Sequence, residues 1–489
     1  MKYGDLLLVI PVLVPLCVAG IGYFNLGYKQ LRLLSLSTPL ALAFTAIAAR
    51  QSGPGERFGS IVYDDALTSF MLMITSLVSL VAVIASWSYL DDQSESKEGY
   101  AKSNKERYLA LFQIFLAAMS MAIVSNNLGI IWVSVEATTI STAFLVAHKG
   151  TSQALEAAWK YVIICSFGIT IAFLGTVLLY FSATHAGISA GNALDLQYLI
   201  RSAPKLDNNT TRLALALLLL GFGAKVGLVP FHTWIADAHS QAPAPVSALM
   251  SGVLLSVAFS IVLRLQLLAR LSIGAGLYQK GLLVMGLSTI VVAALLLVRQ
   301  RDFKRLFAYS SLENMGLIAV AASIGSQAAI LALLLQIFAH GIAKATAFIS
   351  AGQLQHRVGS TSIGDVTSLV RRSPVLGAAL LTATLALLGF PPFAIFLSET
   401  SIAYSINSSS ETVILVIVAI ALTVGFGSIV RHLVSMLFSS GASEASFTIS
   451  HLERTPLIIG ISVSLYVGIF AHPLLDIATR ASLLLGQVR

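Results

Sequence analysis

Residues 213–245 read LALALLLLGFGAKVGLVPFHTWIADAHSQAPAP, and this stretch decides how the whole chain is interpreted. Lys225 lies inside the apolar run, and Pro230 follows it by five residues. Proline removes a backbone donor and clashes with the preceding turn, so the helix is expected to break at Pro230. Broken backbone at membrane depth is tolerated only where protein or a water-filled cavity covers it.

A lysine beside such a break is predicted to be buried and functional, because charges inside a membrane are energetically expensive. There are two alternatives. Lys225 could reach the membrane interface, or it could merely neutralise a nearby carboxylate. The first is difficult, because apolar residues both precede and follow the lysine.

The composition is that of a membrane protein. Of 489 residues, 56% are hydrophobic and 11% are charged, whereas average soluble chains carry about 25% charged residues. A span needs about 20 apolar residues, and runs of that length predict an all-α polytopic membrane protein with about 14 transmembrane helices. The net charge of +8 comes from Lys and Arg scattered over short loops, which indicates membrane topology and no nucleic-acid partner.

The chain is predicted to hold no cofactor and no metal of its own. Its two cysteines, Cys17 and Cys165, both lie in apolar runs and cannot build a cluster. The chain has no ATP-binding loop. The apolar run 5–24 contains Pro11 and Pro15 and is long enough to span, so it is interpreted as the first helix and not as a signal peptide.

A second proline break is predicted at Pro391-Pro392, and Glu399 follows it by seven residues. The two broken helices, the seventh and the twelfth, lie five predicted spans apart. Helices an odd number of spans apart cross the membrane in opposite directions. The two five-helix units that contain them are therefore expected to form an inverted repeat, in which the broken helices line the ion site. The expected units are 108–264 and 275–438, preceded by three helices in 1–107 and followed by one in 455–489.

Basic residues predict the orientation. By the expected boundaries, the loops on one side hold about 16 Lys and Arg, against about 11 for the other side and the termini. The chain is therefore expected to lie in the inner (plasma) membrane, with both termini on the outer face.

Several ionisable residues interrupt the predicted helices, and such chains of acids, lysines and histidines are typical of proton relays. They are Glu136, Lys160, Lys225, Glu313, His340, Lys344 and Glu399, with His232, Asp237 and His239 after the first break. Glu136 and Lys225 are the predicted pair that releases and retakes a proton; the alternative is a static ion pair. His340 and Lys344 are four residues apart and share one helix face.

The other candidates are weaker and have alternatives. Glu399 could be a helix end that meets water, and Glu313 a satisfied core acid. Lys160 could lie at the interface with Glu156 as its partner at i, i+4. His340 could be a hydrogen-bonded core histidine, although the nearby Lys344 favours a relay.

At these motifs the chain resembles the antiporter-like membrane subunits of respiratory complex I and its relatives, over roughly 60–440. The similar motifs are IIWVSVEATTISTAFLV (130–146), GFGAKVGLVPFHTWIADAHSQAPAPVSAL (221–249), RDFKRLFAYSSLENMG (301–316), AHGIAKATAF (339–348) and GFPPFAIFLSE (389–399). VEATT, ALEAAWKY and SSLENMG are most similar to the F subunit of hydrogenase-4-type complexes, which are membrane-bound nickel–iron hydrogenases of the formate hydrogenlyase kind.

This resemblance implies a proton-translocating, non-catalytic subunit of an oxidoreductase complex. It implies 14 helices, inverted repeats and outward termini. Glu136 and Lys225 would be the switch pair, His340 and Lys344 the central relay, and Glu399 the distal gate. The implied partners are other antiporter-like and anchor subunits, membrane lipid, and a soluble hydrogenase arm that carries a nickel–iron centre and iron–sulfur clusters.

One departure bears on conduction. Relatives often carry a lysine or histidine on the helix over 245–263, where this chain has Ser251 and Ser256. Three alternatives therefore stay open: a cation/proton antiporter module, a membrane subunit of an inorganic-carbon uptake system with a soluble zinc partner, and a non-conducting scaffold.

Overall fold

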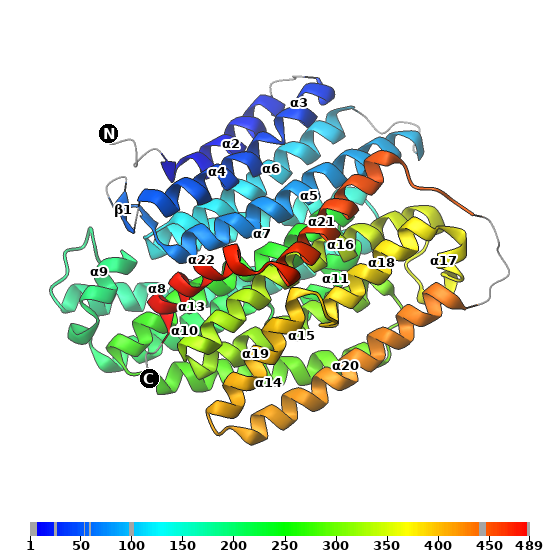
Figure 1. The fold of residues 1–489 in the computed structure, drawn as a ribbon. Helices are drawn as coiled ribbons and strands as arrows, with labels where there is room; N and C mark the ends of the chain where they lie inside the picture. The colour runs from blue at the N-terminus through cyan, green and yellow to red at the C-terminus, as the bar shows by residue number, and fades with distance from the viewer. Residues whose placement is uncertain are drawn as a thin grey trace.

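The computed structural model describes residues 7–23, 27–52, 54–57, 60–96, 102–439 and 446–486. Long helices run side by side through the molecule, with the N-terminal helices along one edge and α20 along the opposite edge (Figure 1). Within these ranges, 11 helices are long and apolar enough to cross a membrane, which confirms the all-α polytopic class. The predicted count of 14 is not confirmed, because several predicted spans are interrupted or begin in polar sequence.

The N-terminal third differs from expectation in its details. Its elements are α2 (Ile10–Tyr23), α3 (Tyr28–Leu34), α4 (Ser37–Ser52), β1 (Gly55–Arg57), β2 (Val62–Asp64), α5 (Ala66–Ser96) and α6 (Lys102–Val124). Of the three helices expected in 1–107, the second is divided between α3 and α4. The long helices α5 and α6 end and begin in polar sequence, DDQSES (91–96) and KSNKER (102–107); residues 97–101 lie outside the described ranges.

The first break lies where the sequence predicts it. The elements of this part are α7 (Leu128–Val146), η1 (Ala147–Lys149), α8 (Ser152–His185), α9 (Leu196–Arg201), η2 (Ala203–Lys205), α10 (Asn208–Val226), α11 (Trp234–Gln241), α12 (Ala244–Leu249), η3 (Met250–Leu254) and α13 (Leu255–Ser272). Gly227 ends α10 in the left-handed region, at φ 85°, where glycine has no steric penalty. The Trp234 indole donates to the Ala224 carbonyl at 3.1 Å and so bridges the break.

The second break is also present. The elements are α14 (Gly276–Val298), α15 (Phe303–Ile324), α16 (Gln327–Val358), η4 (Ile363–Asp365), α17 (Leu369–Arg372), α18 (Pro374–Leu387), α19 (Ala394–Ser408), α20 (Thr412–Phe438), α21 (His451–Ile469) and α22 (His472–Leu485). The prediction of a single helix in 455–489 is wrong: α21 ends at Ile469 and α22 starts at His472, next to Pro473. Proline cannot continue a helix from the preceding turn.

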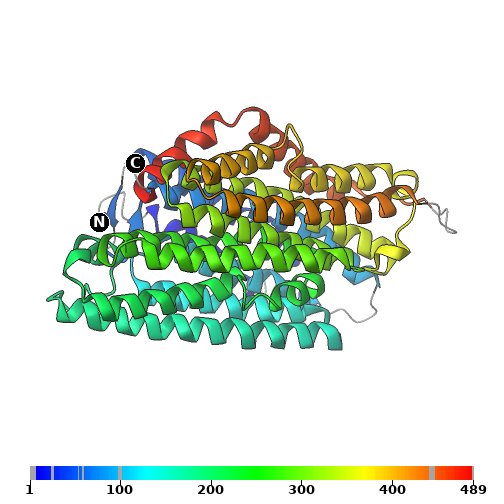
Figure 2. The same cartoon turned by 90° about the horizontal axis from the view of Figure 1, so that it is seen from below.

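Two helical segments form the centre of the bundle. An 18-residue stretch of the segment Ala244–Ser272 is entirely buried, and most of the helix Gln327–Val358 is buried as well. The two segments cross closely. A Cβ added to Gly252 would lie only 2.8 Å from the Gly341 carbonyl oxygen. Small residues of this kind allow helix backbones to approach inside membranes. Figures 1 and 2 both place the start of α2 and the end of α22 at one end of the bundle.

Candidate functional site

Lys225 lies in the last turn of α10 and is fully buried. Its Nζ donates to Thr139 Oγ1 at 2.8 Å and to the Tyr161 hydroxyl at 2.7 Å. The same Nζ lies 4.9 Å from the centroid of the Tyr161 ring. The lysine does not reach the interface, so the first alternative to a buried lysine is excluded.

Close packing of α8 and α10 brings Tyr161 to this lysine. A Cβ added to Gly221 would lie 2.5 Å from the Ala172 nitrogen, and one added to Gly168 would lie 2.4 Å from the Ala224 Cβ. Both glycines therefore permit a backbone approach that larger residues would prevent.

Glu136 lies one turn before Thr139 on α7 and is half-buried. Its Oε1 accepts a hydrogen bond from Ser166 at 2.6 Å, whereas its buried Oε2 has no partner among the described residues. No ion pair within 4.0 Å joins Glu136 to Lys225 in the part of the chain that the structure describes. Glu136 and Lys225 are thus not in contact in this structure, and each is held by hydroxyl groups. Their role as a pair that exchanges a proton stays a prediction.

His340 and Lys344 share one side of α16, and both are fully buried. The Lys344 Nζ donates to the Phe307 carbonyl at 2.7 Å and to the Ser310 hydroxyl, both on α15. Neither ring nitrogen of His340 has a hydrogen-bond partner within the described ranges. His340 is therefore not a histidine satisfied by the surrounding protein.

Ser251 and Ser256 have different surroundings. Ser251 lies in the π-helical turn η3, and its hydroxyl is 2.7 Å from that of Ser311. Ser311 is next to Ser310, the partner of Lys344. Ser256 is fully buried, and its hydroxyl has no described partner. A hydroxyl of this segment thus connects to the Lys344 region through α15, and π-turns are frequent at functional sites.

Glu313 and Glu399 line a common cavity of about 220 Å³ between α15, α18, α19 and α20. Glycines make room for both carboxylates. A Cβ at Gly425 would lie 2.0 Å from Glu313 Oε1, and one at Gly389 would lie 2.5 Å from Glu399 Oε2. Glu313 Oε1 is buried with no partner among the described side chains, so the cavity presents unsatisfied carboxylate oxygen.

A hydrogen-bonded chain that sequence reasoning missed joins these regions. Gln336 donates to the Asn314 Oδ1 at 2.6 Å, and the Ser398 hydroxyl donates to Gln336 Oε1. Gln336 lies one turn before His340, and Ser398 is next to Glu399. The signal was available, because the polar residues 336, 340 and 344 repeat every fourth position and so share one helix face.

The weaker candidates occupy different environments. Lys160 contacts Glu156 at 2.7 Å and Asp237 at 3.4 Å, and about half of its side chain is exposed, as expected for the interfacial alternative. Asp237 also pairs with Arg305 at 2.9 Å. His232 is half-buried.

His239 is fully buried. Its Nδ1 lies 2.8 Å from the Ile235 carbonyl, and its Nε2 has no described partner.

Lys304 is a further buried lysine, which the sequence analysis did not single out. It lies in the first turn of α15, is fully buried, and its Nζ donates to the Ala242 carbonyl at 2.8 Å. The described residues include no group of three His, Cys, Asp or Glu side chains that could hold a metal ion.

A buried lysine beside the first helix break, a half-buried carboxylate beside the second and polar side chains across the bundle centre are the features expected of an antiporter-like membrane subunit. The family model described as "NADH:quinone oxidoreductase/Mrp antiporter, TM" matches residues 125–425, and the chain belongs to this family.

A protein named hydrogenase-4 component F homolog, from Methylacidiphilum infernorum, is 34% identical over 423 residues, which cover 86% of this chain and 85% of the relative. NADH-quinone oxidoreductase subunit M of Pseudomonas aeruginosa is 28% identical over 445 residues, which cover 87% and 82%.

A chain in the structure of an archaeal membrane-bound sulfane sulfur reductase matches with a TM-score of 0.87 at 22% identity. The match covers 99% of this chain and 98% of that one. It shows the fold alone. The predicted resemblance to antiporter-like subunits of complex I and membrane-bound hydrogenases is confirmed.

Proposed function

We propose that this chain translocates protons as a subunit of a hydrogenase-4-like membrane assembly. The observation that carries the proposal is the full burial of Lys225. Among the described residues, its ammonium group has hydrogen-bond partners only in the hydroxyls of Thr139 and Tyr161. Burying an unpaired charge costs several kcal/mol, so retention of this lysine calls for a function. A lysine held by hydroxyls can exchange its proton when a neighbouring charge moves.

The proposed route runs along the bundle centre. It starts at Glu136 and Lys225, continues through Ser251 and Ser311 to Lys344, and passes Gln336 to Glu313 and Glu399. Three hydrogen bonds of the route are in place: Ser251 with Ser311, Lys344 with Ser310, and Gln336 with Asn314. Water is expected to bridge the remaining gaps, because the unsatisfied polar atoms at His340 and Glu313 offer it partners.

The partners in this proposal are other antiporter-like and anchor subunits and a soluble hydrogenase arm. A nickel–iron centre and iron–sulfur clusters in that arm would supply the redox energy. The location is the inner membrane with both termini outside, and the two five-helix units, 108–264 and 275–438, would be an inverted repeat.

The direct test replaces Lys225 with Ala in the assembled complex. Redox-driven acidification by membrane vesicles should be abolished, because the buried proton carrier is gone, while a tag on this chain still recovers every subunit. The matched control is Lys205→Ala, which changes an exposed lysine of η2. Normal pumping by the Lys225 variant would refute the relay. So would normal transport when Glu136 and Lys225 are neutralised together, which would favour a scaffold.

A cation/proton antiporter module is the second candidate. It is supported by the shared cavity of Glu313 and Glu399, because hard cations such as sodium prefer oxygen ligands. Sodium-dependent transport would favour it.

The metal content of the purified complex separates the candidates. Nickel with several equivalents of iron supports the hydrogenase assembly, and iron alone supports a quinone-reducing relative. Zinc alone, with one large soluble partner, supports an inorganic-carbon uptake system.

A further inference from the structure

A cavity of about 350 Å³ lies at the junction of α21 and α22 and shares no lining residue with the relay described above. Its walls come from α4, α5, α16, α21 and α22, and they are apolar except for the Arg50 guanidinium and the Tyr466 hydroxyl. Ile47, Tyr466 and Phe470 line the cavity and are exposed, so it opens on the side of the bundle. Because α4, α5 and α21 belong to candidate membrane spans, the opening faces the bilayer.

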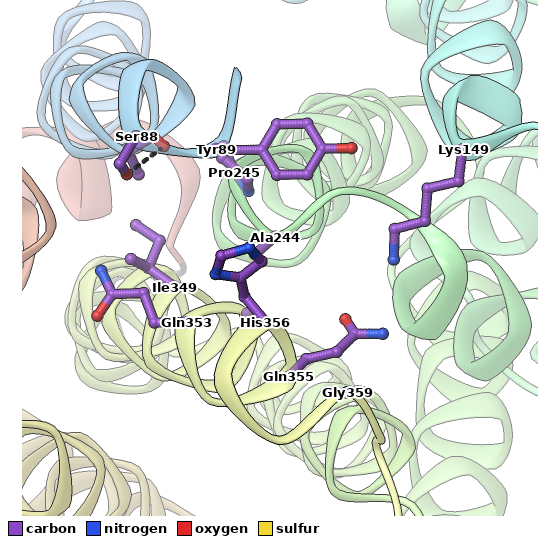
Figure 3. Close-up of a pocket in the computed structure, with 12 residues that line it drawn as sticks. Ser88, Tyr89, Lys149, Ala244, Pro245, Ile349, Gln353, Gln355, His356 and Gly359 are labelled. Carbon is purple, nitrogen blue, oxygen red and sulfur yellow. Dashed lines mark hydrogen bonds between the residues drawn. The ribbon is translucent and has the colours of Figure 1, made fainter. Parts of the chain in front are cut away.

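The cavity at the end of α16 offers a contrast. It has a volume of about 300 Å³, and Figure 3 shows Tyr89, Lys149, Gln355 and His356 around it. Polar walls of this kind give water its hydrogen-bond partners, whereas apolar cavities do not hold water. The apolar cavity beside α21 therefore suits a hydrocarbon chain.

Two arginines and one aspartate form a charged cluster beside the apolar cavity. Arg50, in the last turn of α4, pairs with Asp476 on α22. Arg480 lies one turn further along α22, with its Nε 3.5 Å from the same carboxylate. About half of each arginine side chain is exposed. Because one carboxylate serves two guanidinium groups, the cluster keeps an uncompensated positive charge.

A second cavity, of about 300 Å³, adjoins the apolar one at this cluster, because Arg50 and Ile477 line both. Arg480 lines the second cavity as well, together with Asp64 and Asp65. Both of these acids are buried, and Asp65 is paired with Arg264 at 2.6 Å. The exposed charges among the described lining residues are thus those of the two arginines. A positively charged compartment therefore lies directly next to an apolar one.

We propose that these two adjoining cavities bind one phospholipid with an anionic headgroup. Its phosphate lies between Arg50 and Arg480, and an acyl chain fills the apolar cavity and reaches Phe338 of α16. Guanidinium groups bind phosphate oxygens through paired, charge-assisted hydrogen bonds. The lipid would join α4 to α22 beside the interruption that follows α21. This inference goes beyond the proposed function and requires no proton transport.

The size of the apolar cavity favours a lipid over a helix of a partner subunit. A helix with its side chains is about 10–12 Å across, which is too wide for a cavity of about 350 Å³. A single extended acyl chain is narrow and flexible enough to enter it. The charged cluster adds a reason for an anionic headgroup that an apolar helix face would not supply.

The first test uses the purified complex in lipid nanodiscs that contain a trace of phosphatidylglycerol with a photoreactive group on its acyl chain. After illumination, mass spectrometry should find the label on cavity-lining peptides that include Met73 and Tyr466. Replacement of both Arg50 and Arg480 by Gln should lower this labelling about tenfold, because their charge-assisted hydrogen bonds to phosphate are lost. The control is Arg212→Gln, at an exposed arginine near the start of α10, which should label like the wild type.

Competition with unlabelled lipids tests the headgroup. Excess phosphatidylglycerol should displace the probe, whereas excess phosphatidylcholine should not. Equal competition by the two lipids would overturn the assignment of an anionic headgroup. Absence of label from the cavity peptides of the assembled complex would show that a partner subunit covers the site, and it would overturn the proposal.

Two further variants separate lipid binding from a purely structural role of the charged cluster. Asp476→Asn removes the carboxylate that both arginines share, so labelling should rise about threefold. A fall or no change would mean that the cluster only holds α22 to α4, and it would contradict the proposal. Ile47→Trp narrows the opening and should lower labelling, whereas Ile140→Trp, at an exposed position on α7, should not. Equal labelling of these two variants would place the acyl chain elsewhere.

Discussion

The two helix breaks use the same backbone device and present opposite charges. Each has a glycine in the left-handed region, Gly227 at φ 85° and Gly389 at φ 66°, beside a cis X–Pro bond. At the first, Lys225 is fully buried among hydroxyls. At the second, Glu399 is half-buried beside a cavity that also reaches the exposed Thr423. Under the proposed function, Lys225 would be an interior proton store at the first break and Glu399 an outlet at the second.

A second contrast separates charges that hold the fold from charges that can move protons. Arg264 pairs with Asp65 at 2.6 Å, and Arg357 pairs with Glu453 at 2.9 Å. By contrast, no ion pair is found at Lys225 or Lys344 within the described ranges. An ammonium group that is not locked to a carboxylate is the one that can give up its proton.

Loss of Lys225, the proposed interior proton store, should have the largest effect on transport. Lys225→Ala should abolish proton transport, whereas Glu399→Gln should leave a measurable fraction, because Thr423 and water at the outlet can still pass a proton. Vesicle acidification rates of the two variants check this order. Equal losses would remove the distinction between store and outlet.

The second largest loss of transport is expected when the Glu399 carboxylate is displaced. Gly389→Ala places a Cβ 2.5 Å from Glu399 Oε2 at a residue with positive φ, so the carboxylate must move. The backbone strain should also cost about 1–2 kcal/mol. Gly187→Ala carries the same strain at φ 84° with no atom within 4 Å. Thermal unfolding should show a similar loss in both variants, but only Gly389→Ala should slow transport.

Removal of the Tyr161 hydroxyl, which contacts Lys225, should have a smaller effect on transport. Tyr161→Phe keeps the ring over Lys225 and removes the hydroxyl, which accepts hydrogen bonds from Lys225 and from Thr142. Loss of the bond to Lys225 is worth about 1–2 kcal/mol, so the transport rate should fall about tenfold. Tyr278→Phe removes a hydroxyl that donates to the Val262 carbonyl at 3.1 Å, far from the relay. If both variants pump equally, the Tyr161 hydroxyl does not serve Lys225.

The smallest effect on transport is expected at a structural pair. Burial alone would raise the pKa of the Asp65 carboxyl, but the Arg264 guanidinium and hydrogen bonds from Thr68 hold it below its usual value of 3.8. Because the folded-state pKa is depressed, the pair stabilises the protein above that value, and the contribution is lost as the pH falls below it.

Melting temperatures between pH 3 and pH 6 test this prediction at Asp65. Asp65→Asn should flatten the pH dependence and lower stability by about 3 kcal/mol near neutral pH, with transport per folded complex unchanged. A pH profile that Asp65→Asn leaves as steep as the wild type would contradict the assignment.

The sequence by itself determined the membrane class, the family, both breaks and two of the buried lysines, Lys225 and Lys344. Proline chemistry is local, so the breaks near Pro230 and Pro391 are readable without a structure. A charge within an apolar run is equally visible, which is how Lys225, Lys344 and His340 were found.

Only the tertiary structure decided what surrounds those residues. Tyr161 reaches Lys225 because α8 and α10 pack through glycine, and Phe348 meets His239 across the bundle centre. Lys304 lies among basic residues in the sequence, and only the fold shows that its side chain is fully buried. Hydropathy and proline effects act over a few residues, whereas partners and gates depend on contacts between helices distant in sequence, which no local pattern encodes.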